Sequence, residues 1–333
     1  MDPVKTILVI RLSSIGDIIL TTPLLREVAA AFPGARVDYC TKEPFRLLLA
    51  GNPHINALFT TEKPPAGRYD LVVDLQNNIR SRKLVRKLDA GTTVRYRKRN
   101  WMKLLLVKTG IDLSGEYRSV VERYREPVAG LGVRGDNGHC ELYPSTEDRV
   151  FASTLPECDG PRFALCFGAM HASKRFPPVK FARLLSLLSE SMPLQILLLG
   201  GPDDTRYAAE ILQNLPSPLH ERVIDLSGRC SLMQTAAVLE RCDGVLCNDT
   251  GLMHMASAFG KQLFVLFGSS VPAFGFLPYH TPFELFGVPG LRCRPCSHIG
   301  RDFCPEGHLR CMNDISEDAV VGAILEYFNT VRQ

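Results

Sequence analysis

No apolar run in the sequence approaches the roughly 18–20 residues that a transmembrane helix needs. We also expect no secretory signal peptide, because the apolar stretch near the N-terminus is short, contains Lys5 and Arg11 at its ends, and has no small-residue cleavage site. A content of 45% hydrophobic and 22% charged residues excludes disordered, collagen-like and coiled-coil chains. We therefore expect a globular, cytoplasmic protein, and 333 residues allow about two domains.

Two common nucleotide-binding signatures are absent as well. The loop after the first predicted strand, Ser13 to Asp17, has a single glycine where the dinucleotide fingerprint needs three, which argues against a nicotinamide dehydrogenase. No Walker A sequence occurs anywhere. The isoelectric point is only about 8.5 and no nucleic-acid-binding module is recognisable, so nucleic acid is not an expected partner.

The charge is unevenly distributed along the chain. Residues 1–150 carry 24 Lys and Arg against 17 Asp and Glu, whereas residues 151–333 carry 15 against 18. The excess lies between Arg80 and Lys108, which hold eleven basic residues and one acidic residue. This stretch indicates an anionic partner, and a solvated basic face is the alternative.

Predicted strands and helices alternate along the chain. Short apolar runs predict buried parallel strands, at Thr6–Arg11, Val37–Cys40, Leu71–Leu75, Phe163–Phe167, Gln195–Leu199, Val223–Leu226, Gly244–Cys247 and Leu263–Phe267. Helical periodicity follows most of them, at Ile18–Phe32, Pro44–Ala50, Ile79–Leu88, Val179–Glu190, Thr205–Leu215, Leu232–Glu240, Leu252–Phe259 and Ser316–Val331. A polar, glycine-rich stretch from Gly130 to Asp159 separates two such series, so we expect two doubly wound domains with a cleft between them.

Ligands of such sheets bind at the carboxyl ends of the strands, and polar residues follow three of them. Asp17 opens a helix after the first strand, either as an N-cap carboxylate or as a general base at the cleft. Lys174 and Arg175 follow the strand at Phe163–Phe167, where they suit an anionic group or are surface cations.

The third polar segment follows Gly244–Cys247 and joins a strand to a helix through a tight turn. Gly251 permits close approach of a ligand, and the free N–H groups of the helix start are suited to a phosphate. Asp249 caps the helix, binds a ligand hydroxyl, or does both. His254 is either a ligand contact or a buried structural histidine.

The chain resembles a known family in several segments that keep the family's order as far as about residue 272, namely ILVIRLSSIGDIILTTPLL, YDLVVDLQ, SKRFP, LLLGG, DLSG and CNDTGLMHMASAFGK with the following FGSS. They are similar to the family 9 glycosyltransferases, whose best-known members are lipopolysaccharide heptosyltransferases. The resemblance implies an α/β chain with the GT-B fold, in which two Rossmann-like domains face each other across a cleft. It implies an acceptor domain over 1–155, a nucleotide-sugar domain over 156–315, and a final helix over 316–333 that packs back on the first domain.

The resemblance also assigns roles to individual residues. Asp17 matches the catalytic carboxylate of the S-x-G-D motif, and Lys174 matches the lysine that contacts the donor phosphates. Ser13 and Gly16 flank the carboxylate and have a weaker claim on the acceptor. The D-T-G-x-x-H donor motif is matched by Asp249, Thr250, Gly251 and His254.

The implied reaction is inverting transfer of heptose from ADP-heptose to the inner core of lipopolysaccharide, with no metal needed for catalysis. Arg80 and Arg82, in the basic stretch, are candidate contacts to an anionic, lipid-linked glycan acceptor. Such an acceptor would place the protein at the cytoplasmic face of the inner membrane. Another nucleotide sugar or glycan acceptor, or an inactive donor-binding relic, remains as an alternative.

Four of the eleven cysteines cluster near the C-terminus, at Cys293, Cys296, Cys304 and Cys311. Four thiolates at such spacing can hold zinc tetrahedrally, although the second pair is not C-x-x-C. The cluster is therefore a candidate structural zinc site, and free or redox-linked thiols are the alternative.

Overall fold

The computed structural model describes residues 3–113, 115–157 and 160–331, and contains two parallel β-sheets. The first has five strands in the order β3-β2-β1-β4-β5. Its strands are β1 (Thr6–Ile10), β2 (Arg36–Thr41), β3 (Ala57–Thr60), β4 (Arg68–Asp74) and β5 (Asp89–Arg95). The chain leaves β1 for β2 on one side and returns to β4 on the other, so a ligand crevice is expected between the carboxyl ends of β1 and β4.

The second sheet has six strands in the order β11-β10-β9-β6-β7-β8. Its strands are β6 (Arg162–Cys166), β7 (Gln195–Leu199), β8 (Val223–Asp225), β9 (Gly244–Asn248), β10 (Leu263–Leu266) and β11 (Phe283–Phe286). The equivalent crevice lies between β6 and β9, which pair in parallel. Two doubly wound parallel sheets confirm the predicted fold class.

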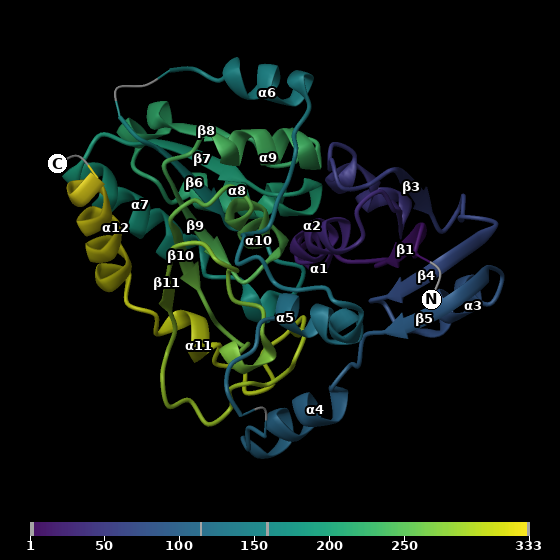
Figure 1. Ribbon diagram of the computed structural model, residues 1–333. Coiled ribbons are helices and arrows are strands. Elements are labelled where there is room, and N and C mark those ends of the chain that lie inside the picture. Colours follow the sequence, from purple (N-terminus) through teal and green to yellow (C-terminus); the bar gives the residue numbers. More distant parts are fainter. Residues whose placement is uncertain (1–2, 114, 158–159, 332–333) are drawn as a thin grey trace.

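Twelve α-helices are described, and they cover the sheets in Figure 1. Their bounds are α1 (Ile15–Ile19), α2 (Thr22–Ala31), α3 (Ile79–Val85), α4 (Asn100–Thr109), α5 (Val120–Arg125), α6 (Thr146–Ser153), α7 (Pro178–Ser191), α8 (Thr205–Gln213), α9 (Leu232–Glu240), α10 (Gly251–Ser257), α11 (Arg310–Asn313) and α12 (Glu317–Val331). Short 3₁₀ segments lie at Glu43–Leu49, Glu126–Leu131, Ala172–Lys174, Pro202–Asp204, Ser217–Arg222 and Pro272–Phe274. In the described part of the chain, none of these helices has the length and apolar character to cross a bilayer.

The helix predicted over Ile18–Phe32 is two helices, α1 and α2. Pro23 has no N–H to donate to the carbonyl of Ile19, four residues earlier. The Thr22 hydroxyl donates to that carbonyl instead, at 2.8 Å, so the chain bends between the helices. Because of this bend, Asp17 lies on a short helix, α1, that is separate from α2.

The final helix does not pack where it was expected. α12 lies against α7 and the second sheet, and the ring centroids of Phe328 and Phe163 are 6.0 Å apart. Its buried side chains Val320 and Ile324 join the apolar cluster of the second half. The prediction that residues 316–333 pack on the first domain is therefore wrong for the described part of the helix, and residues 332–333 lie outside the described residues.

The stretch from Gly130 to Asp159, expected to separate the two series, contains α6, which packs on α9 of the second half; residues 158–159 lie outside the described residues. Arg149 of α6 pairs with Glu240 at 2.8 Å. The predicted boundary at residue 155 assigns α6 to the first domain, but α6 packs against α9 of the second half. Its side chain Ala152 is buried and Phe151 is partly buried.

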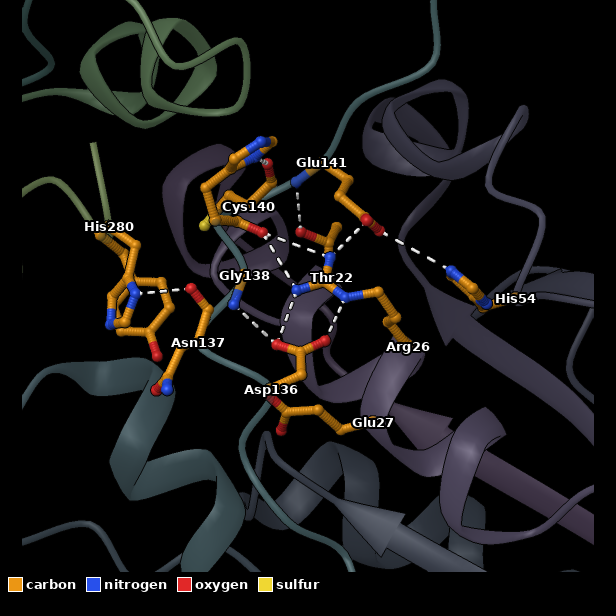
Figure 2. Close-up of polar contacts among 12 residues, drawn as sticks. Thr22, Arg26, Glu27, His54, Asp136, Asn137, Gly138, Cys140, Glu141 and His280 are labelled. Carbon is orange, nitrogen blue, oxygen red and sulfur yellow. Dashed lines mark hydrogen bonds and ion pairs between the residues drawn. The ribbon is translucent and has the colours of Figure 1, made fainter. Parts of the chain in front are cut away.

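The segment before α6, from Asp136 to Glu141, is bound to α2 by ion pairs (Figure 2). Arg26 pairs with both Asp136 and Glu141, and the ring Nδ1 of His280 hydrogen-bonds to the carbonyl of Asn137 at 2.8 Å. His280 belongs to the second half, so this crossing point joins both halves. One continuous apolar cluster also includes buried residues of both sheets.

Candidate active site

Asp17 lies on α1, directly after the carboxyl end of β1, and its side chain is 19% exposed. Arg11 Nη2 lies 2.6 Å from Asp17 Oδ1, and the Tyr124 hydroxyl donates to the same oxygen at 3.2 Å. The backbone N–H and hydroxyl of Ser14 donate to Oδ2. Burial raises the pKa of Asp17, but the Arg11 charge and these hydrogen bonds outweigh burial and leave the pKa below its usual value. The carboxylate is thus ionised at neutral pH.

Lys174 and Asp249 belong to the second half of the chain, where they follow the carboxyl ends of β6 and β9. Lys174 Nζ is 2.7 Å from the Asp249 carboxylate, and both side chains are largely buried. The neighbouring Arg175 points elsewhere: it donates to the carbonyl of Ala169 and pairs with Asp204. Lys174 is therefore the cation that the structure places beside the predicted donor motif.

Three polar atoms around the start of α10 are buried and have no hydrogen-bond partner, namely Thr250 Oγ1, His254 Nδ1 and Asn248 Oδ1. Burial lowers the pKa of His254 to about 4, so its imidazole is neutral at physiological pH. Buried polar atoms normally have partners, and an unpaired one costs free energy. These atoms therefore suit a polar ligand at the start of α10.

The two halves of the site meet through glycines. A Cβ at Gly16 on α1 would lie 2.5 Å from Cδ2 of His254, and one at Gly251 on α10 would lie 2.9 Å from Cβ of Ile15. Only residues without side chains allow α1 and α10 to approach this closely. The close approach brings Asp17 to the donor motif although the two come from different sheets; α1 and α10 lie between the sheets in Figure 1.

A search of family models matches residues 65–305 to "Glycosyltransferase family 9 (heptosyltransferase)", which covers most of the chain. The chain belongs to glycosyltransferase family 9. It is accordingly a glycosyltransferase, as the resemblance predicts.

A curated relative agrees with this assignment, and solved structures share the fold. The lipopolysaccharide heptosyltransferase 2 of Escherichia coli K12 is 28% identical over 295 residues, spanning 80% of this chain and 84% of the relative. A family 9 glycosyltransferase from Veillonella parvula superposes with a TM-score of 0.78 at 23% identity, covering 97% of this chain and 96% of that one. An Escherichia coli heptosyltransferase solved with ADP-2-deoxy-2-fluoro heptose has a TM-score of 0.67 at 20% identity, covering 97% and 99%.

In this glycosyltransferase, two lysines that the sequence did not single out interact electrostatically with Asp17. Burial and the charge of Arg123 outweigh the opposing effect of Asp17 and lower the pKa of Lys103 to about 8. Burial also lowers the pKa of Lys98, while Asp17 again raises it. These lysines therefore share the electrostatic environment of the carboxylate.

The predicted acceptor residues are placed differently. Gly16 is buried against His254, and the Ser13 carbonyl accepts a hydrogen bond from Arg11 Nε at 3.0 Å. Arg80 and Arg82 are exposed on α3, where Arg82 donates to the side chain of Asn77. The two arginines are thus surface residues of α3, and the structure shows no contact between them and Asp17.

Arg11 and Tyr124 were missed as partners of Asp17. The sequence did contain a sign of the role of Arg11, because a charged residue at the end of a buried strand lies at the edge of the sheet where ligands bind. Nothing in the sequence pointed to Tyr124, because 107 residues separate it from Asp17.

The four clustered cysteines line one cavity, together with His308. All four are free thiols, and burial raises the pKa of Cys311 to about 11. Across the described ranges, no three His, Cys, Asp or Glu side chains converge closely enough to hold a metal ion. The cysteine segment touches the loop of Lys174, since the Arg301 N–H donates to Ser173 Oγ at 2.9 Å and the Ser173 N–H donates to the Arg301 carbonyl at 3.0 Å.

Proposed function

We propose that this glycosyltransferase moves heptose from ADP-heptose to the inner core of lipopolysaccharide, at the cytoplasmic face of the inner membrane. The observation that carries the proposal is the meeting of an ionised carboxylate, Asp17, with the buried and unpaired polar atoms of Thr250 and His254. The curated relatives named for lipopolysaccharide heptose transfer and the solved relative with an ADP-sugar support the choice of donor.

Asp17 acts as the general base in this proposal. The acceptor hydroxyl attacks the anomeric carbon, a new C–O bond forms, and the configuration inverts. The proton of that hydroxyl passes to Asp17, whose carboxylate is already ionised. Because Arg11 holds the pKa of Asp17 low, Asp17 is a weak base, and its role depends on being positioned against the hydroxyl.

The bond between the anomeric carbon and the diphosphate oxygen breaks in the same step, and its electron pair leaves with ADP. Lys174 and the N–H groups at Thr250 and Gly251 stabilise the growing negative charge. Asp249 holds Lys174 near the diphosphate. Positive charge develops on the sugar ring, as it does in glycoside hydrolysis.

The acceptor is an anionic glycan on a lipid anchor. Its carboxylates and phosphates bind to the half-buried Lys98 and Lys103 near Asp17, and the exposed Arg80 and Arg82 steer it from the rim.

Nucleotide binding tests this proposal. ADP at about 100 times its dissociation constant is expected to stabilise the protein by about 2.7 kcal/mol, and UDP, GDP and CMP by much less. Lys174→Ala is expected to abolish the thermal shift, while Arg183→Ala, which removes an exposed cation from α7, leaves it unchanged. ADP-heptose and a heptose-deficient core acceptor then test transfer directly. A preference for UDP or GDP, or no shift with any nucleotide, contradicts the proposed donor.

We also propose that the four clustered cysteines bind a structural zinc ion. The donor chemistry suits zinc, because four thiols line one cavity and thiolate sulfur is a preferred zinc ligand, although the thiols do not converge on one centre in this structure. Coordination requires the thiols to close on a shared centre and lose their protons. The ion takes no part in transfer; it holds the segment that contacts Ser173, next to Lys174.

Metal analysis checks the zinc proposal. The purified protein is expected to contain about one zinc per chain, and Cys304→Ser together with Cys311→Ser to remove it and lower the melting temperature. Cys230→Ser serves as the control, because it replaces a half-buried thiol that lies outside the cavity. Metal-free protein whose melting temperature is unaffected by added zinc would show that the thiols are simply free.

A further inference from the structure

Helix α4 has apolar side chains on the side that faces away from the protein. Trp101 is 65% exposed and Leu104 is 51% exposed, and they lie three residues apart on one face of the helix. The loop after α4 adds Ile111 and Leu113, which are 54% and 51% exposed. We call these four residues, with the exposed Lys108, the α4 surface.

The opposite side of α4 attaches the helix to the body of the protein. Leu106 is buried there, and Lys103 Nζ lies 5.4 Å above the ring of Phe276. The apolar residues of the α4 surface are thus additional to those that hold the helix in place. In Figure 1, α4 lies at the lower edge of the molecule, at the opposite end from α6.

The chain that leads into this surface is rich in exposed basic side chains. The stretch from Arg80 to Lys108, which includes α3 and α4, contains eleven basic residues and one acidic residue. Exposed cations occur on both sides of β5, namely Arg80, Arg82, Lys83, Arg86, Lys87, Arg95, Arg97 and Lys108. Exposed apolar side chains within a basic surface are typical of protein elements that lie in the interface of an anionic membrane.

The topology places this surface on the same side as the reaction. α3 follows the carboxyl end of β4, α4 follows the carboxyl end of β5, and Asp17 follows the carboxyl end of β1. These three strands are neighbours and parallel, so the three segments lie at one edge of the sheet. A bilayer on the α4 surface therefore lies along the edge that holds Asp17.

We propose that the α4 surface docks the protein on an anionic lipid bilayer, with Trp101, Leu104, Ile111 and Leu113 entering the boundary between headgroups and acyl chains. The inference rests on the proposed function for one point only, that the acceptor is anchored in that bilayer. The docking itself requires neither donor nor acceptor, so it is tested without them.

Trp101 is the only tryptophan in the chain, so intrinsic tryptophan fluorescence reports on this surface alone. Vesicles of phosphatidylcholine with an equal amount of phosphatidylglycerol are expected to shift the Trp101 emission to shorter wavelength, and brominated acyl chains to quench it. Vesicles of phosphatidylcholine alone are expected to do neither. Binding to the anionic vesicles without any change in Trp101 emission overturns the proposal, because the protein then docks through another face.

Sedimentation with the same vesicles compares variants. Leu104→Ser and Lys108→Glu are each expected to weaken binding by about tenfold. Val150→Ser, in an exposed valine on α6 at the other end of the molecule, is the matched control and is expected to bind as the unmodified protein does. Failure to bind anionic vesicles overturns the inference while leaving ADP binding and transfer to a soluble acceptor intact. A dimer that Leu104→Ser dissociates also overturns it, because a second copy then covers α4.

Discussion

Asp17→Asn is expected to lower kcat for sugar transfer by about a thousandfold, because asparagine cannot accept the proton of the acceptor hydroxyl. The change keeps the size of the side chain, and Asp17 lies on α1 rather than beside Lys174 and Asp249, so the affinity for ADP is expected to remain. Steady-state transfer and the ADP-induced thermal shift, measured on the same preparation, separate loss of chemistry from loss of donor binding.

The same variant is expected to unfold at a lower temperature, because it leaves the buried Arg11 guanidinium without its carboxylate partner. Assays are therefore run well below that temperature. Ser14→Ala is the matched control, since it removes a hydroxyl that donates to Asp17 but keeps the carboxylate, and it should lower kcat only slightly. An Asp17→Asn enzyme with more than about a tenth of the original kcat would rule out Asp17 as the general base.

The buried strands could be predicted from the sequence because each is a short apolar run. Gln195–Leu199 forms β7 with the predicted bounds, and Leu263–Phe267 exceeds β10 by one residue. Edge strand β5 could not be found this way: the sequence DAGTTVR is mostly exposed and has few apolar residues. α4 escaped notice because it lies in the basic stretch and Leu106 is its only buried residue.

The residues of the candidate site that directly follow a buried strand could be predicted from the sequence. Asp17 and Asp249 follow buried strands, and topology places strand ends at the ligand edge. What local sequence cannot give is which side chains from distant segments meet there. The contacts of Asp17 with Tyr124 and of Gly16 with His254 join residues more than a hundred positions apart. The first depends on how the first half folds, and the second on how the two halves pack.

The contact between the two halves can be tested at Gly16. We expect Gly16→Ala to lower kcat/KM by about a hundredfold, although it removes no polar group. The new methyl group would lie 2.5 Å from Cδ2 of the buried His254. Helix α1 must then move away from α10, and Asp17 moves with it. A shift of about 1 Å in a reacting group is enough for a loss of this size, and overpacking of this kind costs about 1–3 kcal/mol of stability.

Gly322→Ala provides the comparison, because nothing lies within 4 Å of a Cβ at that position on α12. It is expected to leave kcat/KM unchanged and to raise the melting temperature slightly, as alanine favours a helix over glycine. Adding His254→Ala to Gly16→Ala makes room for the methyl group and should restore the melting temperature, but not the transfer rate, since His254 belongs to the donor motif. If Gly16→Ala alone keeps normal kcat/KM, Asp17 does not depend on the contact between α1 and α10. If the double variant stays as unstable as the single one, the methyl group does not clash with His254.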